Sequence, residues 1–382
     1  MRNDHLNEDQ VEKAANLVFQ IYDKCPSRAR PRSRSNEIPE WTNLAAVILV
    51  DRKPTIICAA VATGVKVMPN DKIKNCGGKI LHDCHAETLA LRGFNRYLLN
   101  ESKRLEDDNV YVSTSVERHN GVGEPKYRIR STLQLYLLVT EIPCGDASME
   151  NLGAGKLPNW EFDYKIMGQK MLKGRAYYSE LGMIRTKPGR SDSPESLSKS
   201  CTDKLLMKQY TSVLLSPTSY VFSPKGAYLR AILVPRSKII DSAFNRAFRI
   251  EERIKGIAKT QYDFDWIGYN TTFKDSKENT KAGGRPCSVS MVYIENESEQ
   301  VEAITRGMRM GWKAGSEGSI SKLSRRKMAE LAGEISETVR NKLRYSELKD
   351  ESTAREQIKW KTRSNLGRWI RTGDDDFQLC QN

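Results

Sequence analysis

Residues 81–90 read LHDCHAETLA and place His85 two residues before Glu87. In the segment that follows, 86–99, large apolar residues recur at spacings of three and four. This spacing predicts an amphipathic helix, because residues three and four apart share one helix face. The sequence therefore predicts that an imidazole and a carboxylate stand together at the start of a helix packed on a core.

Apolar runs that read as strands alternate with helical patterns along the rest of the chain. The strand-like runs are Leu44–Val50, Ile56–Ala62, Val110–Val116, Leu133–Val139, Ala227–Val234 and Ser288–Ile294. The helical patterns are Glu8–Asp23, Ala86–Leu99, Ile239–Ile257, Lys322–Leu343 and Ser346–Lys361. Continuous apolar strands are typical of sheets covered on both faces, so the alternation predicts a layered α/β fold. No inter-domain linker is visible, and we expect one domain over residues 1–382.

The composition indicates a globular protein with a nucleic-acid partner. The 382 residues include 62 Lys and Arg against 48 Asp and Glu, a formal charge of +14. No apolar run approaches the length of a membrane span, and no segment has the low complexity of a fibrous or fully disordered chain. A large positive surplus is typical of proteins that meet phosphate backbones, although an inert basic surface has the same composition.

The positive charge gathers in two stretches. Residues 24–36 hold five basic side chains and no acid, and residues 164–190 hold seven against the single acid Glu180. The seven are Lys165, Lys170, Lys173, Arg175, Arg185, Lys187 and Arg190. Pro, Gly and Ser interrupt both stretches, which predicts exposed basic loops able to contact phosphates.

Cysteine usage and the first residues indicate the compartment. The eight cysteines are scattered, and none forms a CxxC pair. Residues 1–20 carry charges where a secretory signal needs an apolar core. We therefore expect a reduced intracellular protein, in the nucleus, the cytoplasm or both, with no membrane attachment.

A second chemical signal follows the apolar run 133–139. Pro143 and Cys144 come directly after it, and Pro favours the first turn of a helix, so we expect Cys144 at a helix N-terminus. The helix dipole favours a thiolate there. Catalytic zinc takes three protein ligands and keeps a position open for water, so His85 and Cys144 need a third ligand. Spacing alone leaves that ligand undetermined, and Cys201 is the nearest downstream candidate.

H-x-E followed by P-C is typical of zinc nucleobase deaminases, although their pattern usually ends P-C-x-x-C. LHDCHAE, EIPCGDASM and SCTDK, in this order, resemble the adenosine-to-inosine editing deaminase domain from about Trp41 to Phe377. The resemblance implies zinc held by His85, Cys144 and Cys201, with Glu87 moving protons. It also implies a three-layer cytidine-deaminase-like α/β fold, with a central mixed sheet flanked by helices and elaborated by a C-terminal part.

Within this family the chain is more similar to the tRNA enzymes of eukaryotes. The similarity rests on EWTNLAAVILV at residues 40–50 and on the lack of a duplex-binding module upstream. Ser148 also stands where duplex-editing enzymes carry Arg. The resemblance implies hydrolytic deamination of adenosine to inosine in the anticodon stem-loop of tRNA-Ala, at position 37, by a monomer. The alternatives are a deaminase of duplex or messenger RNA and a catalytically silent RNA-binding relative.

The same family encloses inositol hexakisphosphate. Taken alone, the charged segment 345–359 reads as a solvated helix face, but buried cations need an anion to neutralise them. The resemblance implies a pocket closed by a C-terminal helical part, about residues 320–382, and lined by Arg92, Lys204, Arg325, Tyr345, Lys349, Lys359, Trp369 and Asp375. Arg355, Met207 and Lys208 depart from the family pattern, so the rim is expected to differ.

Substrate contacts are expected from four cations. The resemblance implies that Lys66, in ATGVKV, approaches the substrate. The alternative is a lysine at the end of a strand with no role in binding. Lys170, Lys173 and Arg175 belong to the second basic stretch and are expected to meet phosphates.

Overall fold

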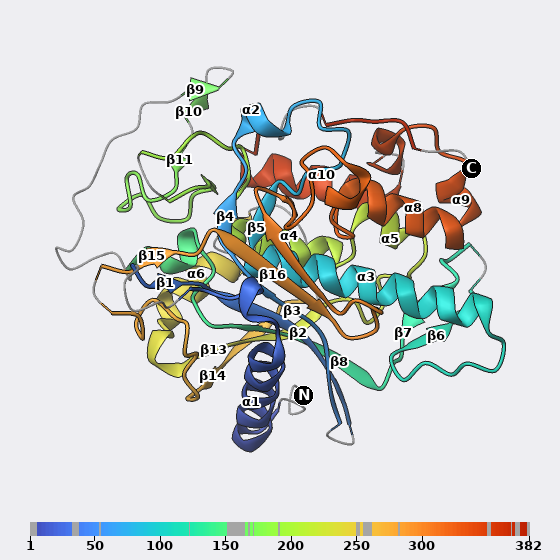
Figure 1. Cartoon of the computed structure of the whole chain (residues 1–382), viewed down its shortest axis with the longest axis horizontal. Coiled ribbons are helices and arrows are strands. Elements are labelled where there is room, and N and C mark those ends of the chain that lie inside the picture. The colour runs from blue at the N-terminus through green and yellow to red at the C-terminus, as the bar shows by residue number, and fades with distance from the viewer. Residues whose placement is uncertain are drawn as a thin grey trace.

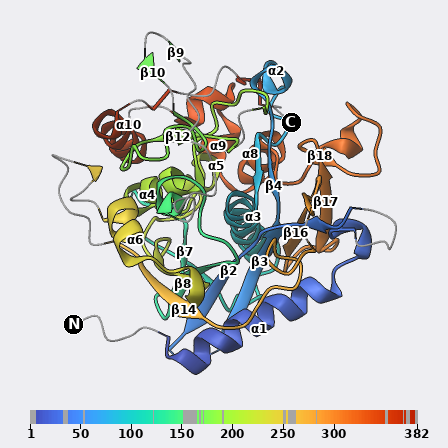
Figure 2. The same ribbon diagram turned by 90° about the vertical axis from the view of Figure 1, so that its left-hand side faces the viewer.

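A mixed eight-stranded sheet forms the centre of the computed structural model (Figures 1 and 2). The structure describes residues 6–32, 38–52, 55–121, 123–150, 165–166, 169–170, 172–189, 192–249, 253–254, 262–281, 283–349, 353–367, 369–370 and 375–379. The strand order is β14 (Asp265–Tyr269), β13 (Leu229–Pro235), β8 (Leu133–Val139), β2 (Leu44–Asp51), β3 (Ile56–Thr63), β16 (Val289–Ile294), β17 (Val301–Thr305) and β18 (Met308–Arg309). β14, β13 and β8 are parallel, and every other neighbouring pair is antiparallel.

The central strands form where the apolar runs predicted them. Seven of the eight residues of β2 are buried, as expected of a strand covered on both faces. The predictions at 44–50, 56–62 and 133–139 are confirmed, and those at 227–234 and 288–294 hold to within two residues. The prediction of an α/β fold with a central mixed sheet flanked by helices is therefore confirmed.

Helices cover both faces of this sheet. α1 (Glu8–Lys24) lies against one face, where its Val11 and Val18 pack with one set of alternating strand residues. α3 (Ala86–Asp107) lies against the other face and buries Phe94 completely. Figure 2 shows the sheet between these two helices. The predicted helix 86–99 is confirmed and extends by two further turns.

The remaining elements join the face covered by α3 or surround the ends of the sheet. The other helices are α2 (Asn70–Ile73), α4 (Cys201–Thr211), α5 (Ser216–Ser219), α6 (Asp241–Phe248), α8 (Arg325–Ile335), α9 (Glu337–Arg340) and α10 (Ala354–Leu366). Short strands pair as β1 (Glu40–Trp41) with β15 (Arg285–Pro286), β4 (Val65–Val67) with β5 (Asp83–His85), β6 (Val116–Arg118) with β7 (Tyr127–Ile129), β9 (Lys165–Ile166) with β10 (Gln169–Lys170), and β11 (Leu172–Lys173) with β12 (Arg185–Thr186). The 3-10 helices are η1 (Ser27–Ala29), η2 (Asp146–Ser148), η4 (Arg236–Lys238), η5 (Glu317–Ser319) and η6 (Tyr345–Lys349).

Several sequence predictions of secondary structure were wrong. The segment 110–116 is not a strand, because Val110 and Val112 are 86% and 73% exposed and only Val116 begins β6. Within the described part of 239–257 the pattern gives the eight-residue α6, and residues 250–252 and 255–257 lie outside the described ranges. The pattern at 322–343 divides into α8 and α9, and the pattern at 346–361 divides into η6 and α10. No helix within the described ranges is long and apolar enough to cross a membrane.

Candidate active site and anion cavity

His85 and Glu87 are positioned by a short hairpin that leads into α3. His85 is the last residue of β5 and pairs with Val65 of β4. Its backbone N–H donates to Asp83 Oδ1 at 3.0 Å, and α3 begins at the next residue. Gly64, at φ +152°, accepts from the N–H of Ala86 at 3.0 Å, and a Cβ on this glycine would lie 2.0 Å from a backbone oxygen of β5. The prediction that His85 and Glu87 begin a helix is confirmed.

Cys144 lies in a tight loop after β8. The prediction that it begins an α-helix is wrong, because only the three-residue η2 follows. Gly145 adopts φ +112°, a conformation that L side chains rarely adopt, and this interrupts a helical start. A Cβ on Gly145 would lie 2.2 Å from Ser200 Oγ, so the loop packs closely on the start of α4.

Cys201 is the first residue of α4, where it meets His85 and Cys144. Both cysteine Sγ atoms lie 3.7 Å from His85 Nδ1. The three ligand atoms all lie within 4.8 Å of one another. Tetrahedral zinc, with bonds of about 2.3 Å to sulfur and 2.05 Å to nitrogen, places such atoms about 3.6 Å apart. The side chains present therefore fit a zinc ion with three protein ligands, and the structure assembles the three candidates named from the sequence.

The two thiols share one negative charge. The Cys201 thiol hydrogen-bonds to Cys144 and lowers the Cys144 pKa well below its ordinary value, assisted by the positive charge of Lys187. The backbone N–H of Cys201 also donates to Cys144 Sγ at 3.4 Å. Lys187 Nζ lies 3.1 Å from Cys201 Sγ. This environment favours the thiolate form of Cys144, whereas burial raises the pKa of the Cys201 thiol.

Glu87 lies beside this cluster on the first turn of α3 and is 7% exposed. Burial raises the pKa of its carboxyl, and the negative charge of Cys144 raises it further. A raised pKa gives the carboxylate a higher affinity for a proton than an exposed carboxylate has, which suits a group that accepts a proton and passes it on.

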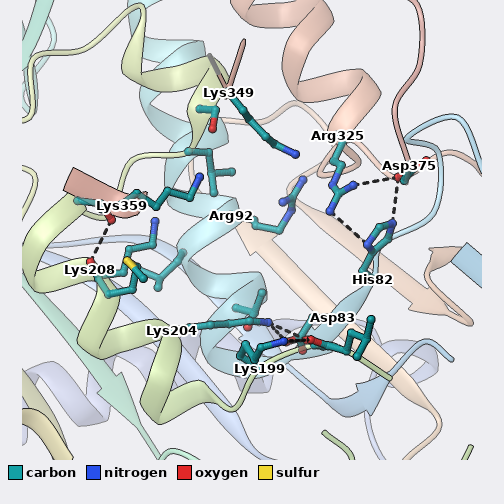
Figure 3. A pocket seen from close by; sticks show the side chains of 18 of the residues that line it. His82, Asp83, Arg92, Lys199, Lys204, Lys208, Arg325, Lys349, Lys359 and Asp375 are labelled. Atoms are coloured by element: carbon teal, nitrogen blue, oxygen red, sulfur yellow. Dashed lines mark hydrogen bonds and ion pairs between the residues drawn. The ribbon is translucent and has the colours of Figure 1, made fainter. Parts of the chain in front are cut away.

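Asp83 connects the thiol cluster to a cavity behind it. Its carboxylate accepts from Lys187 Nζ at 2.8 Å, from Ser198 Oγ at 2.9 Å and from Lys204 Nζ. Burial opposes the charged form of Asp83, but Lys187 and Lys204 outweigh burial and hold its pKa well below its usual range. One carboxylate thus joins Lys187, which contacts Cys201, to Lys204 in the cavity wall, and Figure 3 shows Asp83 beside Lys204.

The cavity has a volume of about 520 Å³ and a cationic lining. All eight residues expected around inositol hexakisphosphate line it: Arg92, Lys204, Arg325, Tyr345, Lys349, Lys359, Trp369 and Asp375. The lining also includes Lys199, Lys208, Arg355 and Arg363, of which Lys199 and Arg363 were not expected. Figure 3 shows the labelled cations pointing inward from different elements. In total, nine Lys and Arg residues face five Asp and Glu residues in the lining.

Crowding of these cations perturbs their proton affinity. Burial lowers the pKa of Lys349 and of Lys359 to about 7, and the neighbouring Arg325 and Arg355, respectively, lower it further. Burial likewise lowers the pKa of Lys208 well below its ordinary value. A polyanion bound in this cavity would therefore favour the protonated, charged form of several lysines at once.

Another cluster with metal-ligating side chains attaches the C-terminal segment to the rest of the fold. Cys76, His82 and Asp375 lie close together, but Arg325 donates to Asp375 Oδ2 and to His82 Nδ1, both at 3.2 Å. A guanidinium only donates, so His82 Nδ1 accepts and Nε2 carries the proton that His82 donates to Asp375 at 3.0 Å. Burial lowers the His82 pKa to about 4, which keeps the ring neutral. Because Nε2 carries this proton, it has no lone pair to offer a metal.

The second basic stretch is partly a core element, which corrects the expectation of an exposed loop. Lys173 is 4% exposed and donates to the backbone oxygen of Ser193 at 2.6 Å, so it does not face solvent as a phosphate contact must. Arg185 and Lys187 are also buried. Arg175 is exposed, whereas the side chain of Lys170 lies outside the described residues.

The other expected substrate contacts lie at the surface. Lys66 is exposed in the middle of β4, next to the strand that carries His85. In the first basic stretch, Arg28 and Arg32 are exposed, and residues 33–37 lie outside the described ranges. Sequence reasoning missed Asp83 and Lys187 as parts of the site, although Asp83 stands within the LHDCHAE stretch.

Comparisons with known proteins show the family of the chain. The model of the adenosine-deaminase (editase) domain matches residues 60–373. The chain is 35% identical over 373 residues to the tRNA-specific adenosine deaminase 1 of Schizosaccharomyces pombe, covering 94% of this chain and 95% of that protein. It is 32% identical over 397 residues to the enzyme of the same name from Saccharomyces cerevisiae, covering 97% and 96%. The double-stranded RNA-specific editase Adar of Drosophila melanogaster is 27% identical over 210 residues, which is 52% of this chain and 30% of that protein.

The lowered lysine pKa values predict a pH-dependent difference between wild type and the Lys349→Met/Lys359→Met variant, both refolded without anions. In the unfolded chain these lysines keep a pKa of about 10.4. Between pH 7 and about 10 the unfolded wild type therefore binds more protons than the folded form, and its stability relative to the variant rises with pH. Urea unfolding at pH 7, 8 and 9 measures this difference. The exposed Lys13→Met change on α1 should give no such trend, and a difference that is flat or falls with pH contradicts the prediction.

Proposed function

The chain belongs to the adenosine-deaminase (editase) domain family, and from this premise we propose that it deaminates adenosine to inosine in tRNA, with zinc as cofactor. The observation that carries the chemistry is the cluster of His85, Cys144 and Cys201, with the buried carboxyl of Glu87 beside it. The tRNA substrate is supported by the two tRNA-specific relatives, which match more than nine-tenths of this chain, whereas the duplex-specific editase matches about half.

The target in this proposal is the adenosine immediately 3′ of the anticodon, position 37 of tRNA-Ala. A base displayed in an anticodon loop is already unpaired, so little unstacking energy is needed to bring it to a buried site. The exposed Arg28, Arg32, Lys66 and Arg175 are the described cations proposed to contact the RNA backbone. The proposed unit is a single editing-deaminase domain, residues 1–382, that acts as a monomer in the nucleus, the cytoplasm or both.

The residues of the chain divide the chemistry between them. Zinc, when bound, lowers the pKa of a coordinated water so that a nucleophile is available at neutral pH. Glu87 would accept one proton of the attacking water and deliver it to the adenine ring nitrogen, and then carry the second water proton to the amino group, which leaves as ammonia. Asp83 accepts from Lys187, and Lys187 contacts Cys201 Sγ, so these two residues hold Cys201 in place within the cluster. Burial of Glu87 raises its pKa toward the range in which both transfers are easy.

Glu87→Gln tests the catalytic assignment. The amide keeps the shape of the side chain but accepts no proton, so we expect inosine formation in tRNA-Ala transcripts to fall by at least roughly 100-fold. Zinc content and tRNA binding should be unchanged, and Glu334→Gln, an exposed change on α8, should retain full activity. A transcript with guanosine at position 37 should yield no inosine. Near-wild-type turnover by Glu87→Gln would refute the assignment.

Cys201→Ala tests the third ligand. Removing one of three protein ligands should lower the zinc content of the purified protein from about one per chain toward zero, as measured by elemental analysis. Cys58→Ala is the matched control, because Cys58 is a buried thiol of β3 outside the cluster. If Cys201→Ala keeps a full equivalent of zinc, the third ligand lies elsewhere.

We also propose that the cationic cavity encloses inositol hexakisphosphate. The support is the convergence of nine Lys and Arg side chains on one cavity with five carboxylates, together with the pKa values of Lys349 and Lys359, which burial lowers to about 7. A compact ring with six phosphates can meet many such donors at once. The C-terminal part, about residues 320–382, closes the cavity in this proposal.

Refolding from denaturant tests the cavity ligand. Inositol hexakisphosphate should raise the melting temperature of the wild type and increase the yield of active protein, because it binds only the folded state. Unphosphorylated inositol should have no effect, and the Lys349→Met/Lys359→Met variant should gain less. Equal folding and activity with and without the hexakisphosphate would contradict the proposal.

A further inference from the structure

Trp41 belongs to a short strand segment that a backbone hydrogen bond links to Gly64, the residue preceding the hairpin of His85. It forms β1, which pairs in parallel with β15 so that Trp41 lies opposite Pro286, and Figure 1 shows the two strands side by side. Two residues further on, Asn43 accepts from the N–H of Gly64 at 3.1 Å, and Gly64 in turn accepts from the N–H of Ala86 at 3.0 Å. Backbone hydrogen bonds thus connect the β1 segment directly to the start of α3.

Cations from distant parts of the sequence surround this tryptophan. Lys277, exposed on the loop before β15, places its Nζ 5.9 Å from the centre of the Trp41 ring. Arg285 pairs with Glu40 at 3.1 Å, and the backbone N–H of Arg32 donates to the same carboxylate at 3.2 Å. The first basic stretch therefore folds back onto β1, and both Arg32 and Arg285 are exposed at its side.

The surroundings of Trp41 suit a residue that binds a nucleotide base. Trp41 is only partly buried, and the ammonium of the exposed Lys277 lies over its ring. A planar base can displace that ammonium from the ring, because both interact with the same π surface, and the freed lysine can then meet the adjoining phosphate. Aromatic platforms flanked by cations are the general means by which proteins hold unpaired nucleotides.

We propose that Trp41 is a stacking platform for a base that neighbours the target adenosine, with Lys277, Arg285 and Arg32 contacting the phosphates on either side. This inference rests on the proposed function and adds the residue that positions the loop at the site. It also gives a role to the EWTNLAAVILV segment, whose tryptophan the catalytic chemistry does not use.

The test compares Trp41→Ala, Trp41→Phe and Trp312→Ala in steady-state deamination of tRNA-Ala. Trp312 is the matched control, because it is 56% exposed and has Arg309 over its ring at 5.7 Å, yet it lies on the loop after β18. Loss of one base stack should raise the KM of Trp41→Ala roughly 10-fold with kcat little changed. Trp41→Phe should restore most of the affinity, and Trp312→Ala should behave as wild type.

Transcripts with a single abasic site on either side of the target separate stacking from a structural role. At the position that stacks on Trp41, removal of the base should raise the KM of the wild type to that of Trp41→Ala. The KM of Trp41→Ala itself should not change. The inference would be overturned if the KM of Trp41→Ala were unaltered. It would also be overturned if the abasic site, at either position, weakened binding by Trp41→Ala as much as it weakens binding by the wild type. Either result would leave the proposed function intact. A wild-type protein inactive on every tRNA would overturn both.

Discussion

The buried carboxylate of Asp83 is the interaction on which the organisation of the site depends. It accepts from Lys187, which reaches the sulfur of Cys201, and from Lys204, which lines the anion cavity. Removing one partner of a buried pair typically costs about 3–5 kcal/mol, because the other charge is left uncompensated. The cationic cavity and the His/Cys cluster are therefore parts of one electrostatic unit, and a change in the charge of the cavity wall is felt at the cluster.

This unit also explains how the chain uses its positive surplus. Lys and Arg residues serve two purposes that composition does not distinguish. Some are exposed at the surface, among them Lys66 in the hairpin of His85, where RNA phosphates are their natural partners in the proposed function. Others line a cavity whose own carboxylates are too few to neutralise them. A net charge of +14 is thus divided between a surface and an interior, and in the proposed function a bound anion neutralises the interior share.

The sequence predicted most of the central strands and the residues of the candidate site, but not how Asp83 connects that site to the cavity. Continuous apolar runs identify β2 and β8 because strands buried on both faces tolerate few polar residues. Spacing could not assign Cys201, which is 57 residues from Cys144, and only the resemblance did.

The errors have physical causes. Lys187 was grouped with exposed loop cations because burial leaves no mark on residue type. The expected helix at Cys144 failed because Gly145 takes a positive φ, which depends on its close approach to Ser200. Native mass spectrometry of active protein tests whether one folded chain holds a zinc ion and an inositol polyphosphate together. We expect the mass of the chain plus one zinc and one hexakisphosphate, and an active species with the mass of the bare chain would overturn the proposal.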